Sequence, residues 1–236
     1  MKFDPPLEPA VFIRRYKRFF ADVVLPDGSP LTIHCANTGS MQYCQEAGTP
    51  CWFSRSDNPR RKLPGTLEVV TTSNGLLAGV NTARPNRLAV EAISMGVISE
   101  LWGYTHMRTE VRYGDEKSRI DLLLESNTEQ CFVEVKNVTL EAGDGLARFP
   151  DAVTERGTRH LRELMRMVGD GQRAVLLFCV QLSGIDKVTV AADIDAGYAE
   201  TLSEAMAAGV EVLAYGCKLQ PDEIVVERKL TFMLPH

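Results

Sequence analysis

The sequence lacks an apolar run long enough to cross a bilayer. Its longest apolar stretch is AVLLFCV at residues 174–180, whereas a membrane-spanning helix needs about 18–20 apolar residues. The first ten residues, MKFDPPLEPA, contain no apolar segment of the signal-peptide kind. We therefore expect a cytoplasmic protein with no membrane partner.

The six cysteines form no CxxC pair. Cys131 and Cys179 lie inside apolar, strand-like runs, where a reduced cysteine acts as a small hydrophobic residue. One zinc site is conceivable, from Cys35, Cys44, Cys51 and His34. The spacing of these residues does not match the common zinc ribbons and fingers, and isolated histidines such as His34 or His106 are more often structural. The cysteines thus fit a reducing compartment.

A strongly basic composition is also missing, since the formal net charge is −5. That balance argues mildly against nucleic acid as a partner. The charge is unevenly distributed, however. Residues 1–90 contain 11 Lys and Arg against 7 Asp and Glu, whereas residues 91–236 contain 15 against 24. Such an asymmetry between the two halves suggests two different roles.

Residues 1–82 contain about five short strand-like runs separated by turn-rich segments. The clearest candidates are FIRRYKRFFADVVL (12–25), LTIHCA (31–36), CWFSRS (51–56) and TLEVVTT (66–72). PDGS (26–29) separates the first two as a turn. This pattern predicts a small closed β-barrel of the OB type, followed by a linker at TARPN (82–86).

Residues 83–236 alternate between helical and strand patterns. The expected elements are a helix over 86–103 with Asn86 as its N-cap, three antiparallel strands over 105–113 and 118–138, a helix over 154–169 capped by Thr154, a strand over 173–182, a helix over 195–209 ended by Gly209, and strands over 210–217 and 224–234. This order predicts a three-layer α/β domain with a mixed sheet. The fold class is thus α/β (α+β), with an OB-like barrel at 1–82 and the larger domain at 83–236.

The hairpin RIDLLLESNTEQCFVEVKN (119–137) carries charge where a core is expected. With Ser126 to Glu129 as its turn, Glu125 faces Gln130. The same register places Asp121 opposite Glu134, on the sheet face that also carries Lys136. Three charged side chains are therefore expected to converge on one face of one sheet.

That convergence is costly without a cation. Two carboxylates ~4 Å apart repel by about 4 kcal/mol at an effective dielectric near 20. Lys136 offsets part of this repulsion, and a divalent metal would offset more. The alternative is an exposed strand face with ordinary salt bridges. The apolar strands around the charges, the basic helix that follows and the helix with Glu91 that precedes favour the metal.

At these residues the chain resembles the PD-(D/E)xK nuclease superfamily, although Ile120 stands where the motif has Pro. Longer strings are similar to the sugar fermentation stimulation protein family of bacteria and archaea over nearly the whole chain. They are NTGSM (37–41), TARPNRLAVEA (82–92), RIDLLLE (119–125), VEVKNVTL (133–140) and FPDAVTERGTRHLREL (149–164).

The resemblance implies an OB-type domain joined to a nuclease-like domain. It also implies sequence-non-specific DNA binding and a possible role in regulating sugar use, such as maltose metabolism. Asp121 and Glu134 then match the ligands of Mg²⁺ or Mn²⁺, with Glu91 as a further ligand and the carbonyl of Val135 completing the shell. Lys136 matches the catalytic lysine, which would position water for hydrolysis of a phosphodiester bond.

Basic residues that could contact DNA lie on the first strand, on the loop NPRRKLPG (58–65), beside the linker and on the helix after the hairpin. The candidates are Arg14, Arg15, Lys17, Arg18, Arg60, Arg61, Lys62, Arg84, Arg87, Arg156, Arg159 and His160. In RRYKRFF (14–20) they interleave with aromatic residues, a pattern that suits phosphate neutralisation and base stacking. Each group could instead be an ordinary solvated surface.

No recognition-helix or finger motif is present, so binding should be dominated by phosphates and fall steeply with salt. Two other functions stay open. The protein could be a DNA-binding regulator without catalysis, or its barrel could recruit a protein partner. The sequence shows no sugar site, and it leaves the oligomeric state undetermined.

Overall fold

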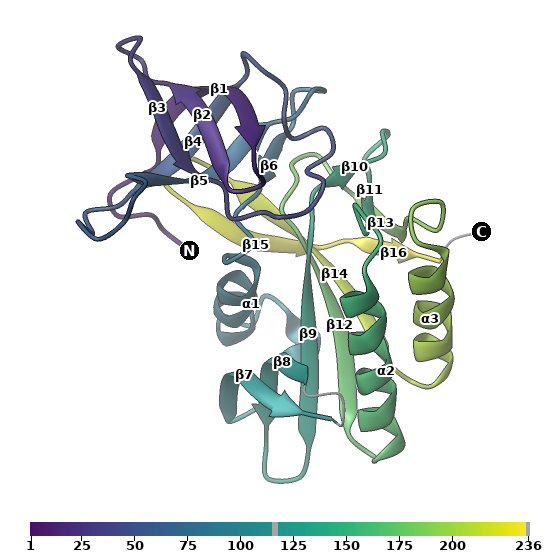
Figure 1. The fold of residues 1–236 in the computed structure, drawn as a ribbon. Coiled ribbons are helices and arrows are strands. Elements are labelled where there is room, and N and C mark those ends of the chain that lie inside the picture. Colours follow the sequence, from purple (N-terminus) through teal and green to yellow (C-terminus); the bar gives the residue numbers. More distant parts are fainter. Residues whose placement is uncertain (115–117, 235–236) are drawn as a thin grey trace.

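The computed structural model describes residues 1–114 and 118–234 (Figure 1). Its first part is a β-barrel of β1 (Glu8–Tyr16), β2 (Phe20–Val24), β3 (Pro30–His34), β4 (Pro50–Arg55), β5 (Gly65–Thr71) and β6 (Leu77–Gly79). Among the described residues the strand order is β3-β2-β1-β4-β5-β6, and a parallel contact between His34 and Thr66 joins β3 to β5. This contact closes the sheet, so the expectation of an OB-type barrel is confirmed.

The expectation of one strand over residues 12–25 is wrong, because the chain reverses at Lys17 and Arg18. Both residues have left-handed backbones, with φ of 47° and 62°. Tyr16 then pairs with Phe20 across a tight β1–β2 hairpin, and their rings stack at 5.3 Å. Two consecutive residues with positive φ favour Asn or Gly, so this turn carries no recognisable sequence signal.

The second part consists of α1 (Pro85–Ser94), the 3₁₀ turn η1 (Ser99–Leu101), β7 (His106–Tyr113), β8 (Ser118–Glu125), β9 (Gln130–Val138), β10 (Leu140–Glu141), β11 (Leu146–Phe149), α2 (Glu155–Gly169), β12 (Arg173–Val180), β13 (Lys187–Val190), α3 (Ala196–Ala207), β14 (Glu211–Leu219), β15 (Ile224–Lys229) and β16 (Thr231–Met233). The main sheet has the order β15-β14-β12-β9-β8-β7 in the described chain. Strand β12 runs parallel to β9 and β14, whereas β7, β8 and β9 are antiparallel, so the sheet is mixed.

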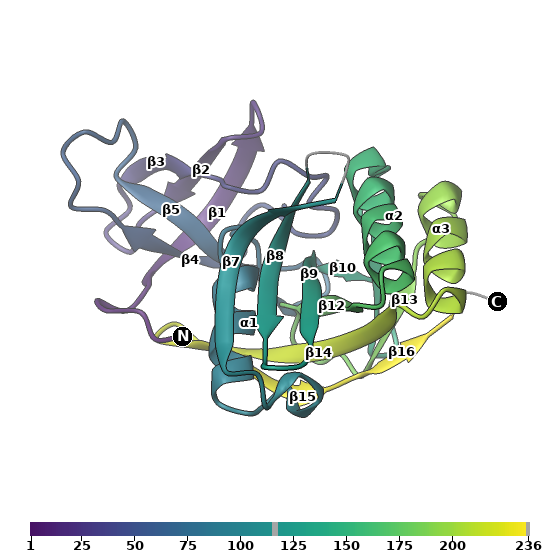
Figure 2. The same cartoon turned by 90° about the horizontal axis from the view of Figure 1, so that it is seen from below.

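Helices cover both faces of the main sheet (Figures 1 and 2). Along β12, Val175 and Leu177 pack in one apolar cluster with Leu88 of α1. Leu176 and Phe178 pack in a second cluster, which also contains residues of α2 and α3. Alternate side chains of a strand point to opposite faces. The three-layer architecture predicted from the sequence is therefore confirmed.

Helix α2 begins as expected, since the Thr154 side chain accepts a hydrogen bond from the Gly157 N–H at 3.0 Å. Helix α1 does not begin at an Asn86 cap. Pro85 occupies its first turn, Arg84 precedes it without a capping side chain, and the helix ends at Ser94 rather than continuing to residue 103. Asn86 thus lies inside the helix, where its side chain is available to the neighbouring strands.

The sequence reading also missed a second, small sheet of order β10-β11-β13-β16 among the described strands. Its strands are short and pair with partners far away in the chain. The segment over residues 224–234, expected as one strand, is consequently divided between β15 of the main sheet and β16 of this small one.

The barrel is packed firmly on the α/β part. Barrel residues such as Phe12 and Met41 share one apolar cluster with Leu161 of α2. The segment before β1 also crosses over, because Phe3 N–H donates to the Asp222 carbonyl at 2.8 Å. The two parts are therefore held as one body. In the described portion of the chain, we find no helix with the length and apolar character that crossing a membrane requires.

Candidate functional site

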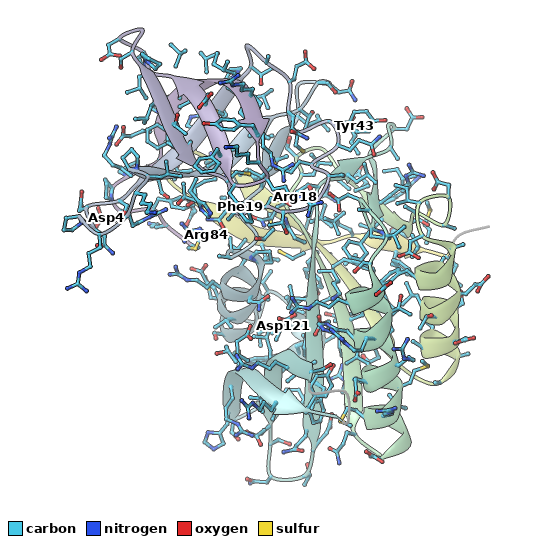
Figure 3. The ribbon with its side chains drawn as sticks, in the orientation of Figure 1. Asp4, Arg18, Phe19, Tyr43, Arg84 and Asp121 are labelled. Atoms are coloured by element: carbon cyan, nitrogen blue, oxygen red, sulfur yellow. The ribbon has the colours of Figure 1, made fainter. Side chains whose placement is uncertain are left out.

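A cleft of about 450 Å³ opens where the barrel meets the α/β part. Its lining comes from the barrel, the linker, α1, β7, β8, β9, β11 and α2, and includes Asn37, Thr82, Asn86, Glu110, Asp121, Glu134, Lys136, Arg148, Asp151, Arg156 and His160. Figure 3 shows Asp121 between α1 and α2, below the barrel. The cleft therefore brings Asp121, Glu134 and Lys136 together, as the sequence predicts.

The loop with NTGSM (37–41) forms the barrel side of this cleft. Ser40 Oγ and the Met41 N–H donate to Asp151 Oδ2 at 3.0 and 3.2 Å. A Cβ on Gly39 would lie 3.0 Å from an oxygen of Asp151, so a glycine allows this close approach. Two of the family-like strings, 37–41 and 149–164, are thus in direct contact.

Asp121 lies at the point where β8 and β9 separate. The predicted register holds from Glu125–Gln130 to Leu122–Val133. The next pair, Asp121 and Glu134, does not continue the described ladder, because Asp121 Oδ2 accepts the Val135 N–H at 2.8 Å. The expectation that they face each other within the ladder is corrected accordingly. Asn86 Nδ2 donates to the other oxygen, Oδ1, at 2.8 Å.

Glu134 is 2% exposed and uses its two carboxylate oxygens differently. Oε1 accepts a hydrogen bond from Lys136 Nζ at 2.7 Å and contacts His160 Nδ1. Oε2 is buried and has no hydrogen-bond partner among the described residues. Buried carboxylate oxygens are normally satisfied, so Oε2 is an orphaned acceptor on a residue that lines the cleft.

His160 lines the cleft but is almost fully buried, and it contacts Glu134. Arg156 Nε lies 3.3 Å from His160 Nε2. Arginine can only donate, so we assign Nε2 as the acceptor and Nδ1–H as the donor to Glu134. His160 therefore connects Arg156, at the rim of the cleft, to the carboxylate inside it.

The two carboxyl groups have opposite pKa shifts. Burial, followed by the nearby charge of Glu134, raises the pKa of Asp121 to about 6. Burial would also raise the pKa of Glu134, but Lys136 and His160 outweigh it and hold that pKa below its ordinary value. Glu134 is thus the stabilised anion of the cleft, and Asp121 is the carboxylate that lacks compensation.

Glu91, expected as a further metal ligand, lies elsewhere. Its Oε2 is 2.5 Å from the Met1 ammonium, and it lines a neighbouring hollow with Lys2 and Arg87. The N-terminal segment reaches α1 through its pairing with the β14–β15 turn, a contact that the sequence pattern does not reveal. The first-helix acid is therefore engaged by the chain's own N-terminus.

The predicted DNA-contact residues of the barrel fall into two groups. Lys17, Arg18, Arg60 and Lys62 are exposed on turns. The other arginines have partners within the protein: Arg14 bonds to Asp22, Arg15 to the Asn37 carbonyl and Arg61 to the Thr66 hydroxyl, at 2.8 Å in each case, although Arg14 and Arg61 are also exposed. Figure 3 shows Arg18 and Phe19 at the barrel edge that faces the α/β part. Phe19 is 49% exposed.

Arg84 is a structural residue rather than a surface contact. Its guanidinium binds the fully buried Glu68 carboxylate at 2.5 and 2.9 Å, and Glu68 also accepts from Ser54 and Asn81. Burial requires such a charge to be paired. Arg87 is exposed, Arg156 lines the cleft, and Arg159 is half-buried outside the described cleft lining.

Sequence reasoning missed three cleft residues, Asn86, Glu110 and Arg148. Asn86 was interpreted as a helix cap. Arg148 lies on β11, which was not predicted, and it pairs with Asp193 at 2.8 Å. Glu110 could have been found from register, because Thr109 pairs with Leu122 and Val111 with Ile120, which places Glu110 across from Asp121.

The cleft offers a donor set for a hard divalent cation. The oxygens of Asp121 and the orphaned Oε2 of Glu134 are the ligand type that Mg²⁺, Mn²⁺ and Ca²⁺ prefer. In the described arrangement, no three His, Cys, Asp or Glu side chains are placed to hold a metal together. The residues therefore fit a cation held by few protein ligands, as is usual for Mg²⁺.

The fold and the cleft define a class of protein: an OB-type barrel joined to a mixed-sheet α/β domain. Comparisons with known proteins identify the family. The model for the SfsA N-terminal OB domain matches residues 13–80, and that for the sugar fermentation stimulation protein RE domain matches residues 83–223. The chain belongs to the sugar fermentation stimulation (SfsA) family.

Relatives match over almost the full length. The sugar fermentation stimulation protein homologs of Saccharophagus degradans and Azotobacter vinelandii are 56% and 57% identical to this chain, over 98% and 99% of it and 99% and 100% of their own lengths. The solved structure of Pyrococcus furiosus SfsA in complex with Ca²⁺ has a TM-score of 0.88 at 29% identity, covering 99% of this chain and 98% of that one.

Proposed function

We propose that this protein binds DNA without sequence preference and hydrolyses phosphodiester bonds at the cleft with a divalent cation. One observation carries the proposal: Glu134, which lines the cleft, has one oxygen neutralised by Lys136 and the other buried without a described partner. Asp121 supplies a second carboxylate there. The P. furiosus relative, solved with Ca²⁺, supports a divalent cation on this fold.

Asp121 and Glu134 would hold Mg²⁺ or Mn²⁺. When bound, such a cation supplies Lewis-acid chemistry and lowers the pKa of water. The protein's own groups do the positioning. Lys136 is 12% exposed and is fixed by Glu134 Oε1, so its ammonium group can orient water and stabilise negative charge on a phosphoryl oxygen. His160 contacts the same oxygen of Glu134 and helps to orient the carboxylate.

Arg156 lines the cleft, and Lys17, Arg18, Arg60 and Lys62 are exposed on the barrel. These side chains would neutralise backbone phosphates. Phe19, beside Arg18, would stack on a base. The chain as a whole carries a net charge of −5, so we expect affinity to depend on these local groups and to fall steeply between 50 and 300 mM salt.

The test compares wild-type protein with Lys136→Ala, in a Mn²⁺-dependent cleavage assay on mixed DNA substrates and in a DNA-binding titration. Loss of cleavage with nearly unchanged DNA affinity is expected. Lys218→Ala is the matched control, because Lys218 is exposed on β14. Equal cleavage by Lys136→Ala and wild type would refute the mechanism, and affinity insensitive to salt would refute phosphate-dominated binding.

A second candidate is DNA binding without catalysis. It is favoured by the internal partners of Glu134, since Lys136 and His160 already satisfy one oxygen without any cation. A role in regulating sugar or maltose use would then run through DNA binding. The six buried thiols fit a cytoplasmic location for either role. Mn²⁺ binding that leaves DNA uncut under all conditions would favour this candidate.

A further inference from the structure

Glu110 occupies an unusual position on β7, facing Asp121 in the β7–β8 pair. Its φ is 55°, a left-handed backbone within a strand. For residues other than Gly this conformation is uncommon, and it favours Asn or Gly over Glu. Such strain tends to persist at functional sites, where the surrounding structure holds it in place. The backbone conformation of Glu110 therefore suggests a functional role for this residue.

The apolar pattern of both strands changes face at the Glu110–Asp121 pair. Met107 and Leu122 pack in the apolar cluster with α1, whereas Val111 and Ile120 pack in the cluster with α2 and α3. Glu110 and Asp121 thus lie at the point where the side chains of both strands change the sheet face to which they point. Both of them line the cleft.

Asn86 connects the two acids. Its Nδ2 lies 2.8 Å from Asp121 Oδ1 and 3.5 Å from Glu110 Oε1, so these oxygens are no more than about 6.3 Å apart. Two oxygens bound to one Mg²⁺ are at most ~4.2 Å apart, since each bond is ~2.1 Å. Glu110 is exposed, and a rotation of its side chain can close the remaining gap.

We infer that Glu110 is a third carboxylate of the cation site, in addition to Asp121 and Glu134. The inference rests on the proposed divalent cation. It is supported independently by the buried, unpartnered Oε2 of Glu134 in the same cleft. Glu110 takes the place that the helix acid Glu91 was expected to fill, because Glu91 is paired with the Met1 ammonium.

The experiment is calorimetric titration with MnCl₂ alone, without DNA, on wild-type protein, Glu110→Gln and Glu91→Gln. The two variants remove the same charge: both side chains line the neighbouring hollow, but of the two only Glu110 also lines the cleft with Asp121. Removal of groups that support a metal typically lowers affinity 10–100-fold. We expect Glu110→Gln to raise the Kd for Mn²⁺ at least about tenfold, and Glu91→Gln to leave it within about twofold of wild type.

A fold control uses Glu110→Gly, since glycine adopts positive φ without steric cost. In EDTA this variant should melt at or above the wild-type temperature and still lose Mn²⁺ affinity, which a purely structural role would not produce. A Kd within twofold of wild type in both Glu110 variants would overturn the inference and leave the proposed function intact. Absence of Mn²⁺ binding by the wild type would overturn both.

Discussion

The opposite pKa shifts of Asp121 and Glu134 predict opposite effects of neutralising the two carboxylates. The pKa of Asp121 is raised from 3.8 to about 6. At about 1.4 kcal/mol per pH unit, its ionisation costs the metal-free fold about 3 kcal/mol. Asn accepts fewer hydrogen bonds than a carboxylate, and Val135 and Asn86 both donate to Asp121, so the substitution loses part of this gain. The net effect of Asp121→Asn should be to stabilise the metal-free protein by about 1–3 kcal/mol at pH 8.

The pH dependence follows from the sign of this shift. A carboxyl group whose folded-state pKa is raised contributes stability that is fully present below pH 3.8 and is lost as the pH rises through about 6. The advantage of Asp121→Asn over wild type should thus be absent near pH 4 and grow through pH 6. For a chain of this length, the melting temperature should rise by roughly 2–10 °C at pH 8.

Glu134→Gln should destabilise the metal-free protein, the opposite of Asp121→Asn, because the pKa of Glu134 is lowered. Its charge contributes stability above its ordinary pKa of 4.5, and this stability is lost as the pH falls below that value. Without the anion, Lys136 is left unpaired in a nearly buried position. Breaking a buried ion pair costs about 3–5 kcal/mol, so Glu134→Gln should melt well below wild type at pH 8.

Thermal melts of the three proteins in EDTA, from pH 4 to pH 8, test this reasoning. The informative result is the sign of each difference at pH 8. Shifts of both melting temperatures in the same direction, or a gain of Asp121→Asn that persists unchanged at pH 4, would refute the opposite pKa shifts.

Two further predictions concern the barrel. Phe19→Ala should weaken binding of a fluorescent single-stranded oligonucleotide by about 1–3 kcal/mol, the usual contribution of base stacking, and leave the melting temperature unchanged. Phe19→Trp should retain affinity. Equal binding by wild type and both variants would contradict a stacking role for Phe19. Arg84→Ala should lower the free energy of unfolding by about 3–5 kcal/mol because it leaves the buried Glu68 unpaired, as measured by urea unfolding. Arg60→Ala, on an exposed loop, should lower DNA affinity and leave the free energy of unfolding unchanged. A loss of stability in Arg60→Ala with none in Arg84→Ala would contradict the DNA-binding role of Arg60 and the structural role of Arg84.

The main features of the site were predictable because they depend on local rules. Choosing Ser126 to Glu129 as the turn set the register that the structure shows from Glu125–Gln130 to Leu122–Val133. The predicted register does not extend to Asp121, because its side chain, rather than the backbone of β8, accepts the Val135 N–H. A side-chain acceptor that replaces a ladder contact leaves no trace in the alternation of apolar and polar residues.

Other features depend on contacts between distant parts of the chain. Glu91 was predicted as a metal ligand from its place on the first helix, but the N-terminal ammonium reaches it through pairing with the β14–β15 turn. Arg84 looked like an exposed linker residue, and only the fold shows the buried Glu68 beside it. The β1–β2 turn was missed because Lys17 and Arg18 are not residues that usually adopt positive φ.

Three energetic penalties coincide in the cleft of the metal-free protein. Asp121 carries a raised pKa, Glu134 Oε2 is buried without a described partner, and Glu110 holds a left-handed backbone within a strand. By contrast, the buried charge of Glu68 is matched by Arg84. Proteins break such local rules mainly at functional sites. The proposed divalent cation would neutralise the two facing acids and satisfy the orphaned oxygen together, and coordination by Glu110 would give its strained backbone a function.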